Sequence, residues 1–344
     1  MKSFVGYTKG VNLGGWLSQF DSYKESHFLS FIGESDFENI AKMGFDHVRV
    51  PVDYVLLEDE VGVRNPLGYE LLHQALSWCR KFGLSMILDL HEVYGYSFDP
   101  LKHGDKKKFF FDRALQSRFY NLWEQIAHEF HNDGDILAFE LLNEVVPIEV
   151  FQEWREIANK AIKVIRKSCP THYIVYGGVC YNAATSVPLL GKPYDDHVVY
   201  NFHCYEPLPF THQKAYWVEK MDMERSVNYP EKIGKYVEIA KSLDKNLALL
   251  ESKDPNKIIG KEFFEEFFAP AIKAAEDYDV PLYCGEYGVI DQAPVEDTLR
   301  WLKDINDVFH KYGIGHALWN YKGKDFGLVD GPRASYCELI AKFC

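Results

Sequence analysis

Short apolar runs recur along the chain, and the intervals between them leave room for a helix. Their residues are largely β-branched or aromatic, and several runs end at Gly, Pro or a polar side chain, which is typical of buried parallel strands. The runs begin at Gly10, His47, Ser85, Ile136, Tyr173, Val198, Pro281 and Gly315. Eight such strands with intervening crossovers predict an α/β fold, a (β/α)8 TIM barrel, and leave a doubly wound sheet as the alternative.

The segments between these runs have the periodicity of amphipathic helices. Residues 69–83, 119–131, 264–279 and 296–313 carry apolar side chains at i, i+3, i+4 and i+7. Ser35 and Glu38 read as a capping-box pair at the start of a further helix, which Gly44 would end. Pro270 is expected to kink or to start a helix.

The chain reads as one domain, residues 1–344, with a subdomain embedded in it. Its 344 residues are 47% apolar, which is enough for a large core. The interval between Val198 and Leu282 is much longer than the others and predicts an inserted subdomain at approximately residues 206–260. No fixed-period repeat or low-complexity linker divides the sequence.

Composition restricts the partners and the compartment. The formal net charge is −13 and no long basic run occurs, so we expect no nucleic acid or membrane partner. We also expect a monomer. Seven cysteines without a CxxC pair indicate free thiols in a reducing compartment. The first residues lack the apolar core of a signal peptide. This fits a cytoplasmic protein, export by an unrecognised route, or secretion with the signal already removed.

Polar and aromatic residues stand where the predicted strands end. Since the active site of a barrel forms at the C-terminal ends of its strands, these side chains are expected to share one mouth. They are Arg49 with Pro51, His91, Asn143 with Glu144, Asn182, His203 with Tyr205, Glu286 with Tyr287, and Trp319 with Asn320.

Two carboxylates interrupt the apolar stretch "AFELLNEV", residues 138–145. A buried carboxylate is costly unless it is paired, hydrogen-bonded or protonated. Glu144 and Glu286 would face each other from opposite walls of the barrel, and one protonated and one ionised carboxyl are the machinery of glycoside hydrolysis. Glu140 has the parity of Glu144 but lies deeper, where it would be a structural acceptor for Arg49. The alternative for the pair is two structural salt bridges.

These strand ends, read in order, resemble those of a known family. "RVP", "LDLH", "LLNE", "NFHCY", "CGEYG" and "ALWNY" resemble glycoside hydrolase family 5 over nearly the whole chain. The flanking text "GVNLGGW", "FTHQKAYW" and "LYCGEYGVI" resembles clostridial-type endoglucanases, which carry an insertion after strand six. The resemblance implies a retaining (β/α)8 hydrolase with its two glutamates on strands four and seven.

The resemblance also implies roles for the residues around the scissile bond. Glu144 would be the general acid/base and Glu286 the nucleophile. Arg49 would lie near Glu286 and keep it ionised, and Tyr205 would donate a hydrogen bond to it. Asn143 would bind the 2-hydroxyl of the sugar.

Further residues would hold the sugar ring. By the same resemblance, His91 and His203 would bind hydroxyls of the sugar before the scissile bond, with His203 also near Glu144. Trp319 would be the platform under that ring. Candidates for outer subsites are Trp16, Tyr94 and Trp217, for which core packing is an equal interpretation.

The predicted function is an endo-acting, retaining β-glucanase that cleaves β-1,4 bonds in cellulose-type and mixed-linkage β-1,3-1,4-glucans, without cofactor or metal. The alternatives are a mannanase, a xylan-active enzyme, an exo-1,3-glucanase or a non-catalytic carbohydrate-binding protein. A metal-dependent hydrolase finds little support, because no HExxH or CxxC spacing is present. Its ligands would have to come from His91, His203, Cys180, Cys204 and Cys284.

Overall fold

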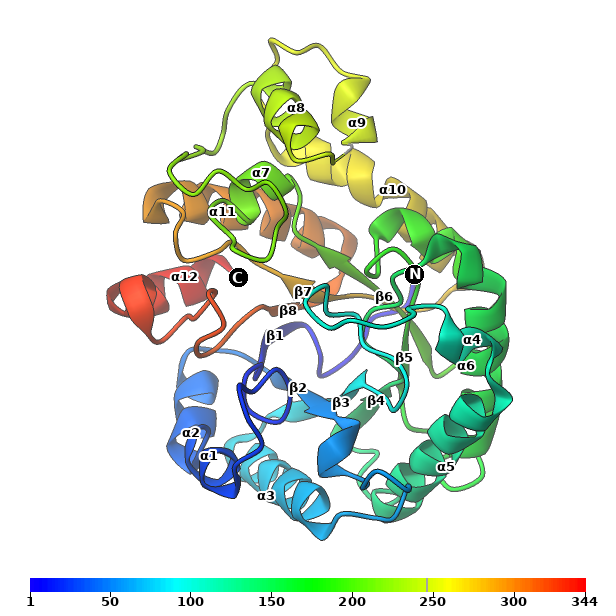
Figure 1. The fold of residues 1–344 in the computed structure, drawn as a ribbon. Helices are drawn as coiled ribbons and strands as arrows, with labels where there is room; N and C mark the ends of the chain where they lie inside the picture. Colours follow the sequence, from blue (N-terminus) through cyan, green and yellow to red (C-terminus); the bar gives the residue numbers. More distant parts are fainter. Residues whose placement is uncertain (246) are drawn as a thin grey trace.

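The computed structural model describes residues 1–245 and 247–344. Within this part of the chain, parallel strands pair in sequence order and the last pairs with the first, which closes a barrel (Figure 1). The strands are β1 (Lys9–Asn12), β2 (His47–Asp53), β3 (Ser85–Glu92), β4 (Leu137–Glu140), β5 (Ile174–Gly177), β6 (Val198–Cys204), β7 (Leu282–Tyr287) and β8 (Gly315–Leu318). The predicted (β/α)8 architecture is confirmed.

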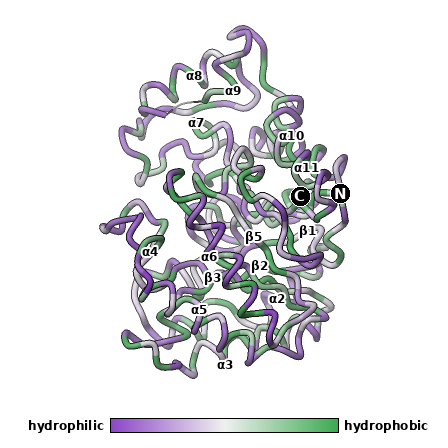
Figure 2. Tube along the Cα trace, turned by 90° about the vertical axis from the view of Figure 1, so that its right-hand side faces the viewer, coloured by the Kyte–Doolittle hydropathy of each residue, from purple (hydrophilic) through white to green (hydrophobic). Residues whose placement is uncertain are grey.

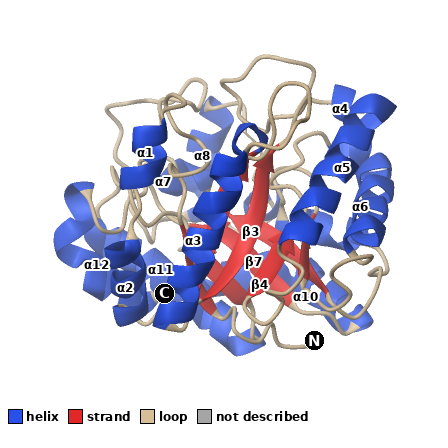
Figure 3. Ribbon diagram, turned by 90° about the horizontal axis from the view of Figure 1, so that it is seen from below, coloured by secondary structure: helices blue, strands red, loops and turns tan. Residues whose placement is uncertain are grey.

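Helices surround the strands on their outer side (Figure 3). The α-helices are α1 (Glu25–Ser30), α2 (Glu34–Lys42), α3 (Pro66–Phe82), α4 (Lys108–Phe111), α5 (Arg113–Glu129), α6 (Phe151–Ile165), α7 (Leu208–Thr211), α8 (Ile233–Ser242), α9 (Ala248–Glu251), α10 (Lys261–Tyr278), α11 (Val295–Tyr312) and α12 (Cys337–Phe343). Short 3₁₀ helices are η1 (Tyr54–Leu56), η2 (Ile148–Val150), η3 (Ala184–Leu190) and η4 (Gly331–Tyr336).

The structure bears on two local predictions about helices. Helix α2 is capped by Gly33, whose backbone N–H donates to the Asp36 carboxylate at 2.8 Å, so the capping box does not involve Ser35 and Glu38. Helix α10 runs through Pro270, so this proline does not start a helix, and a kink at Pro270 stays a prediction. Tertiary packing of an apolar face stabilises a helix more than a single local signal does.

The strands divide the core into two layers. Between strands and helices lies the larger apolar layer. Inside the barrel, at the N-terminal ends of the strands, a second cluster contains Phe4, Tyr7, Ile87, Ala138, Val175, Val199, Tyr283 and Ala317. Figure 2 shows apolar segments along the strands and polar segments on the outer loops. This second cluster fills the barrel at the N-terminal ends of the strands, so the polar side chains inside the barrel lie toward the C-terminal ends.

The connection between β6 and β7 contains α7, α8, α9 and α10. Helices α8 and α9 project beyond the ring of helices in Figure 1. That residues 206–260 are an inserted subdomain stays a prediction, and residue 246 of that segment lies outside the described residues.

The structure also gives the state of the cysteines and the length of the helices. All seven cysteines lie within the described residues, and all are free. Among the helices of residues 1–245 and 247–344, none is long and apolar enough to cross a membrane.

Candidate active site

Arg49 is the centre of a buried polar cluster. It stands within β2 rather than at its end, and its side chain is inaccessible to solvent. Its Nε and Nη2 donate to the two oxygens of Glu140 at 2.7 and 2.9 Å, which confirms Glu140 as a structural acceptor. Its Nη1 donates to Oε1 of Glu286 at 2.7 Å. One guanidinium therefore joins β2, β4 and β7.

The remaining donors of Arg49 also have partners. Nη1 donates to Oδ1 of Asn12 at 2.9 Å, and Nη2 donates to Oδ1 of Asn143 at 2.8 Å. Nη2 also lies 3.0 Å from Oδ2 of Asp89. Burial alone would lower the pKa of Arg49, but the carboxylates of Asp89, Glu140 and Glu286 outweigh it and raise that pKa well above its ordinary value. The guanidinium is thus a fixed positive charge.

Glu286 projects into the barrel because β7 contains a bulge. Phe202 pairs with Cys284 and His203 with Glu286, so Gly285 is the extra residue on β7. The hydroxyl of Tyr205 donates to Oε2 of Glu286 at 2.9 Å, and Arg49 holds Oε1. Both carboxylate oxygens of Glu286 are therefore fixed, as predicted for Arg49 and Tyr205.

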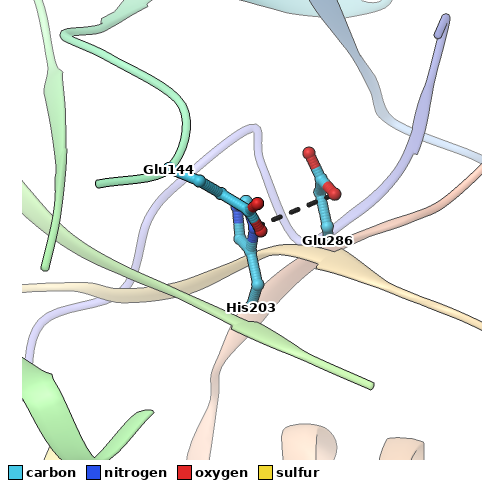
Figure 4. A group of neighbouring side chains, drawn as sticks. All are labelled: Glu144, His203 and Glu286. Atoms are coloured by element: carbon cyan, nitrogen blue, oxygen red, sulfur yellow. Dashed lines mark hydrogen bonds and ion pairs between the residues drawn. The ribbon is translucent and has the colours of Figure 1, made fainter. Parts of the chain in front are cut away.

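Glu144 faces Glu286 in a different environment (Figure 4). It follows the end of β4, and its side chain is buried. Its Oε1 lies 2.8 Å from Nδ1 of His203, which in turn is 3.8 Å from Oε2 of Glu286. Burial raises the pKa of Glu144 to about 7, against a smaller lowering by Arg49. One carboxyl is thus held by a cation, whereas burial favours the protonated form of the other up to a pH of about 7.

His91, Asn143 and Trp319 lie beside this pair. Nδ1 of His91 is 2.5 Å from Oδ2 of Asp89, and Nε2 of His91 is 3.5 Å from Nδ2 of Asn143. The rings of His91 and Trp319 are parallel within 5°, with centroids 5.9 Å apart. Trp319 is 6% exposed, so little more than an edge or one face of its ring meets solvent.

Some residues predicted at the mouth lie elsewhere. Tyr287 points out of the barrel and packs against Trp301 and Phe309, since it follows the bulge with opposite parity. Asn320 does not line the mouth, because its amide bonds both backbone groups of Gly14.

The three candidates for outer subsites have different surroundings. Trp16 is fully buried and donates to the carbonyl of Phe28 at 2.8 Å, so its place is in the core. Tyr94 is partly exposed, with the Arg118 guanidinium 3.7 Å from its ring centroid. Trp217 is half-buried within the aromatic group around Phe326. The subsite roles of Tyr94 and Trp217 stay predictions.

Three polar residues that hold the site were not among those predicted from the sequence. Asn12 and Asp89 bond Arg49, and Asn201 donates to Oε1 of Glu140 at 2.9 Å. Asn182, which was predicted at the mouth, is buried, and its amide donates to the carbonyl of Asn143 at 2.5 Å. The position of Asp89 could have been predicted, because it stands two residues before His91 and so lies on the same face of the strand.

A metal ion is the other way to use these side chains. Glu144, His203 and Glu286 offer three potential ligand atoms within 4.8 Å of one another. The carboxylate of Glu286 already has Arg49 and Tyr205 as partners. A cation among these atoms would be repelled by the guanidinium, so the donor set suits a proton-transfer site better than a metal site.

A closed (β/α)8 barrel with two facing carboxylates at the C-terminal ends of β4 and β7 is the architecture of a glycoside hydrolase. The model of the cellulase family, glycosyl hydrolase family 5, matches residues 8–325. The chain belongs to glycosyl hydrolase family 5, and it is a glycoside hydrolase of the endoglucanase type.

Relatives support this assignment along the chain. Cellodextrinase A of Ruminococcus flavefaciens is 43% identical over 316 residues, 90% of this chain and 84% of the relative. Endoglucanase C of Acetivibrio thermocellus is 38% identical over 332 residues, 96% of this chain and 95% of the relative. The crystal structure of endoglucanase Cel5A from Thermotoga maritima has a TM-score of 0.75, covering 98% of this chain and 97% of that one. At 22% identity it supports the fold.

Proposed function

We propose that the protein is a retaining, endo-acting β-glucanase that hydrolyses β-1,4 bonds in cellulose-type and mixed-linkage β-1,3-1,4-glucans. Glu144 is the general acid/base and Glu286 the nucleophile. The observation that carries the assignment is the contrast between the two carboxyls. Glu286 accepts from Arg49 at 2.7 Å and from Tyr205 at 2.9 Å, whereas burial raises the pKa of Glu144 to about 7.

The reaction proceeds in two displacements. Glu144 protonates the glycosidic oxygen while Glu286 attacks the anomeric carbon, and a glycosyl-enzyme forms as the sugar chain leaves. Glu144, now a carboxylate, removes a proton from water, which attacks the anomeric carbon and releases Glu286. One oxygen of Glu144 lies within 4.8 Å of one oxygen of Glu286. So close an approach favours the separation of about 5–5.5 Å between the carboxyl groups of retaining enzymes over the roughly 6.5–9.5 Å of inverting ones.

The other site residues bind the sugar that is attacked. We assign the 2-hydroxyl to Asn143 and further hydroxyls of that sugar to His91 and His203. Asn143 is fixed by its bond to Arg49, and His91 by its bond to Asp89. Trp319, parallel to His91, supplies a flat apolar face for the sugar C–H groups. Rigid partners of this kind hold the ring in a reactive geometry.

The proposed substrate is inferred from the names of the relatives and from the residues of the site. Two relatives are named endoglucanase and cellodextrinase, and both names support a β-1,4-glucan. Mannose differs from glucose by an axial 2-hydroxyl, the group that Asn143 and Glu286 would contact. A wrong contact there reduces transition-state stabilisation, so we infer discrimination against mannan. No resident cofactor is part of the proposal, and the protein is proposed to act as a monomer.

The anomeric form of the first product tests the mechanism. We expect proton NMR during hydrolysis of barley β-glucan to show the β-anomer first, followed by mutarotation. An initial α-anomer would exclude the double displacement.

A further inference from the structure

The turn after β5 has an unusual backbone. Cys180, Tyr181 and Asn182 have φ values of 56°, 58° and 52°, so three consecutive residues other than glycine are left-handed. A side chain in this region is sterically unfavourable, and such a conformation persists only where the surroundings fix it. Strained segments of this kind cluster at functional sites.

This turn is attached to both sides of Glu144. The backbone N–H of Tyr181 donates to the carbonyl of Val145 at 3.1 Å, and the side-chain amide of Asn182 donates to the carbonyl of Asn143 at 2.5 Å. The backbone N–H of His203 donates to the carbonyl of Asn182 at 2.8 Å. The turn therefore joins the residues that flank Glu144 to the strand that carries His203.

The orientation of the Asn182 amide follows from its first bond. A backbone carbonyl only accepts hydrogen bonds, so the atom 2.5 Å from the Asn143 oxygen is the amide nitrogen. Asn182 is fully buried, and Gly177 leaves it room, because a Cβ on Gly177 would lie 2.4 Å from Oδ1 of Asn182. The side chain is therefore held in one orientation.

The second N–H of Asn182 points at the ring of His203. Nδ2 of Asn182 lies 3.4 Å from Nε2 of His203, which makes Nε2 an acceptor and places the ring proton on Nδ1. Nδ1 is 2.8 Å from Oε1 of Glu144 and so donates to it. An Oε1 that accepts from His203 leaves the acid proton on Oε2.

The charged and titratable groups around His203 come from other strands. They are Glu144 and Glu140 on the β4 side, Arg49 on β2, His91 on β3 and Glu286 on β7. Burial, with an opposing effect of Glu286, lowers the pKa of His203 to about 4. The ring is therefore neutral at neutral pH, and its single N–H proton can lie on either Nδ1 or Nε2.

We propose that Asn182 is a positioning residue that fixes His203 as the Nδ1–H tautomer and thereby keeps the catalytic proton on Oε2 of Glu144. The inference rests on the proposed role of Glu144 as the acid. When the leaving oxygen takes the proton from Oε2, the N–H of His203 remains on Oε1 and stabilises the new carboxylate. With the other tautomer, Nδ1 would accept the Glu144 proton and compete with the glycosidic oxygen.

The variant Asn182→Gly tests this without straining the backbone, because glycine favours the left-handed region. The matched control is Cys180→Gly, which relaxes the same turn and leaves the amide in place. Nitrogen-15 NMR of protein labelled at the histidine rings reads the tautomer, with the His203 resonance assigned by its loss in His203→Gln. We expect Nδ1–H in the wild type and in Cys180→Gly, and a mixture or Nε2–H in Asn182→Gly. A proton on Nε2 in the wild type, or an unchanged tautomer in Asn182→Gly, would overturn the proposal.

Kinetics supply the second measurement. We expect Asn182→Gly to lower kcat/KM about tenfold or more on aryl cellobiosides with poor leaving groups, and little on those with activated leaving groups, which need no acid. Equal losses on both would indicate a structural role and overturn the proposal. If the wild type cleaved no glycoside, the proposed function would fail, while the NMR measurement would still decide the role of Asn182.

Discussion

Arg49 donates to Glu140 through two nitrogens and to Glu286 through a third, so one buried guanidinium sets the position of the proposed nucleophile. Glu140 is inaccessible to solvent and fixes the angle of the guanidinium plane, and one N–H bond of Nη1 then points at Glu286. The fork geometry of arginine is what allows both contacts at once.

Replacing Arg49 by lysine is expected to damage both activity and stability. An ammonium cannot serve Glu140 and Glu286 in the same geometry, so buried acceptors lose their partners. We expect kcat/KM to fall by a factor of about 100 or more and the free energy of unfolding by about 3–5 kcal/mol. Urea unfolding and hydrolysis assays measure the two effects.

The control for this variant is Arg80→Lys. Arg80 also pairs with two carboxylates, Asp133 and Asp135, but the pairs lie at the surface. For Arg80→Lys we expect the free energy of unfolding to change by less than about 1 kcal/mol and the activity to stay unchanged. Similar losses of activity and stability in both variants would contradict the role assigned to the buried contacts of Arg49.

The two glutamates are expected to respond to azide in different ways. In Glu286→Ala, azide fills the space of the missing nucleophile and attacks from the α-face, which gives an α-glycosyl azide. In Glu144→Ala, the glycosyl-enzyme still forms from activated aryl glycosides, and azide then displaces Glu286 to give a β-glycosyl azide. NMR of the products separates the two outcomes. The same azide anomer from both variants would contradict the assigned roles.

The pH dependence of activity follows from Glu144. Burial raises the pKa of this carboxyl to about 7, and the acid must be protonated to act. We expect kcat/KM on unactivated glucan to fall as the pH rises through about 7, and the Glu144→Ala variant to lack this basic limb on activated aryl glycosides. A basic limb retained in that variant would assign the titration to another group.

Stability should depend on the same carboxyl. The folded state binds its proton more tightly than the unfolded chain, where the pKa is about 4.5, so its contribution to stability declines as the pH rises from about 4.5 through about 7. Glu144→Gln stays neutral and should exceed the wild type in stability at pH 8 by on the order of 2 kcal/mol, and match it near pH 4. Glu70→Gln, at an exposed position, controls for the loss of one charge. A constant difference at both pH values would contradict the assignment.

Substrate preference is expected to favour glucans. We predict rapid viscosity loss on carboxymethylcellulose or barley β-glucan, products of mixed length, and poor cleavage of mannan. Comparison of kcat/KM values on the three polymers measures this. A higher kcat/KM on mannan than on either glucan would contradict the proposed substrate. Glucose as the only early product would contradict endo action. Activity confined to soluble cello-oligosaccharides would instead match the name of the Ruminococcus relative.

The sequence by itself determined the barrel and most of the site. Alternating apolar runs and amphipathic helices can bury their faces in few ways, and a parallel barrel is one of them. The polar residues at the strand ends were readable because the C-terminal ends of parallel strands meet at one mouth. Glu140 as the partner of Arg49 followed from the two-residue period of a strand, and the structure confirms it.

Only the tertiary structure decided which way Glu286 points. Tyr283 faces the inside of the barrel, so strict alternation would turn Glu286 outward. The bulge at Gly285 reverses this, and it is held by Asn201, which accepts from the Gly285 N–H at 2.9 Å, and by Asn12, which donates to its carbonyl at 3.0 Å. Those contacts join distant parts of the chain, so no local pattern predicts them. The same holds for the raised pKa of Glu144, because burial is a property of the packed neighbours and not of the residue.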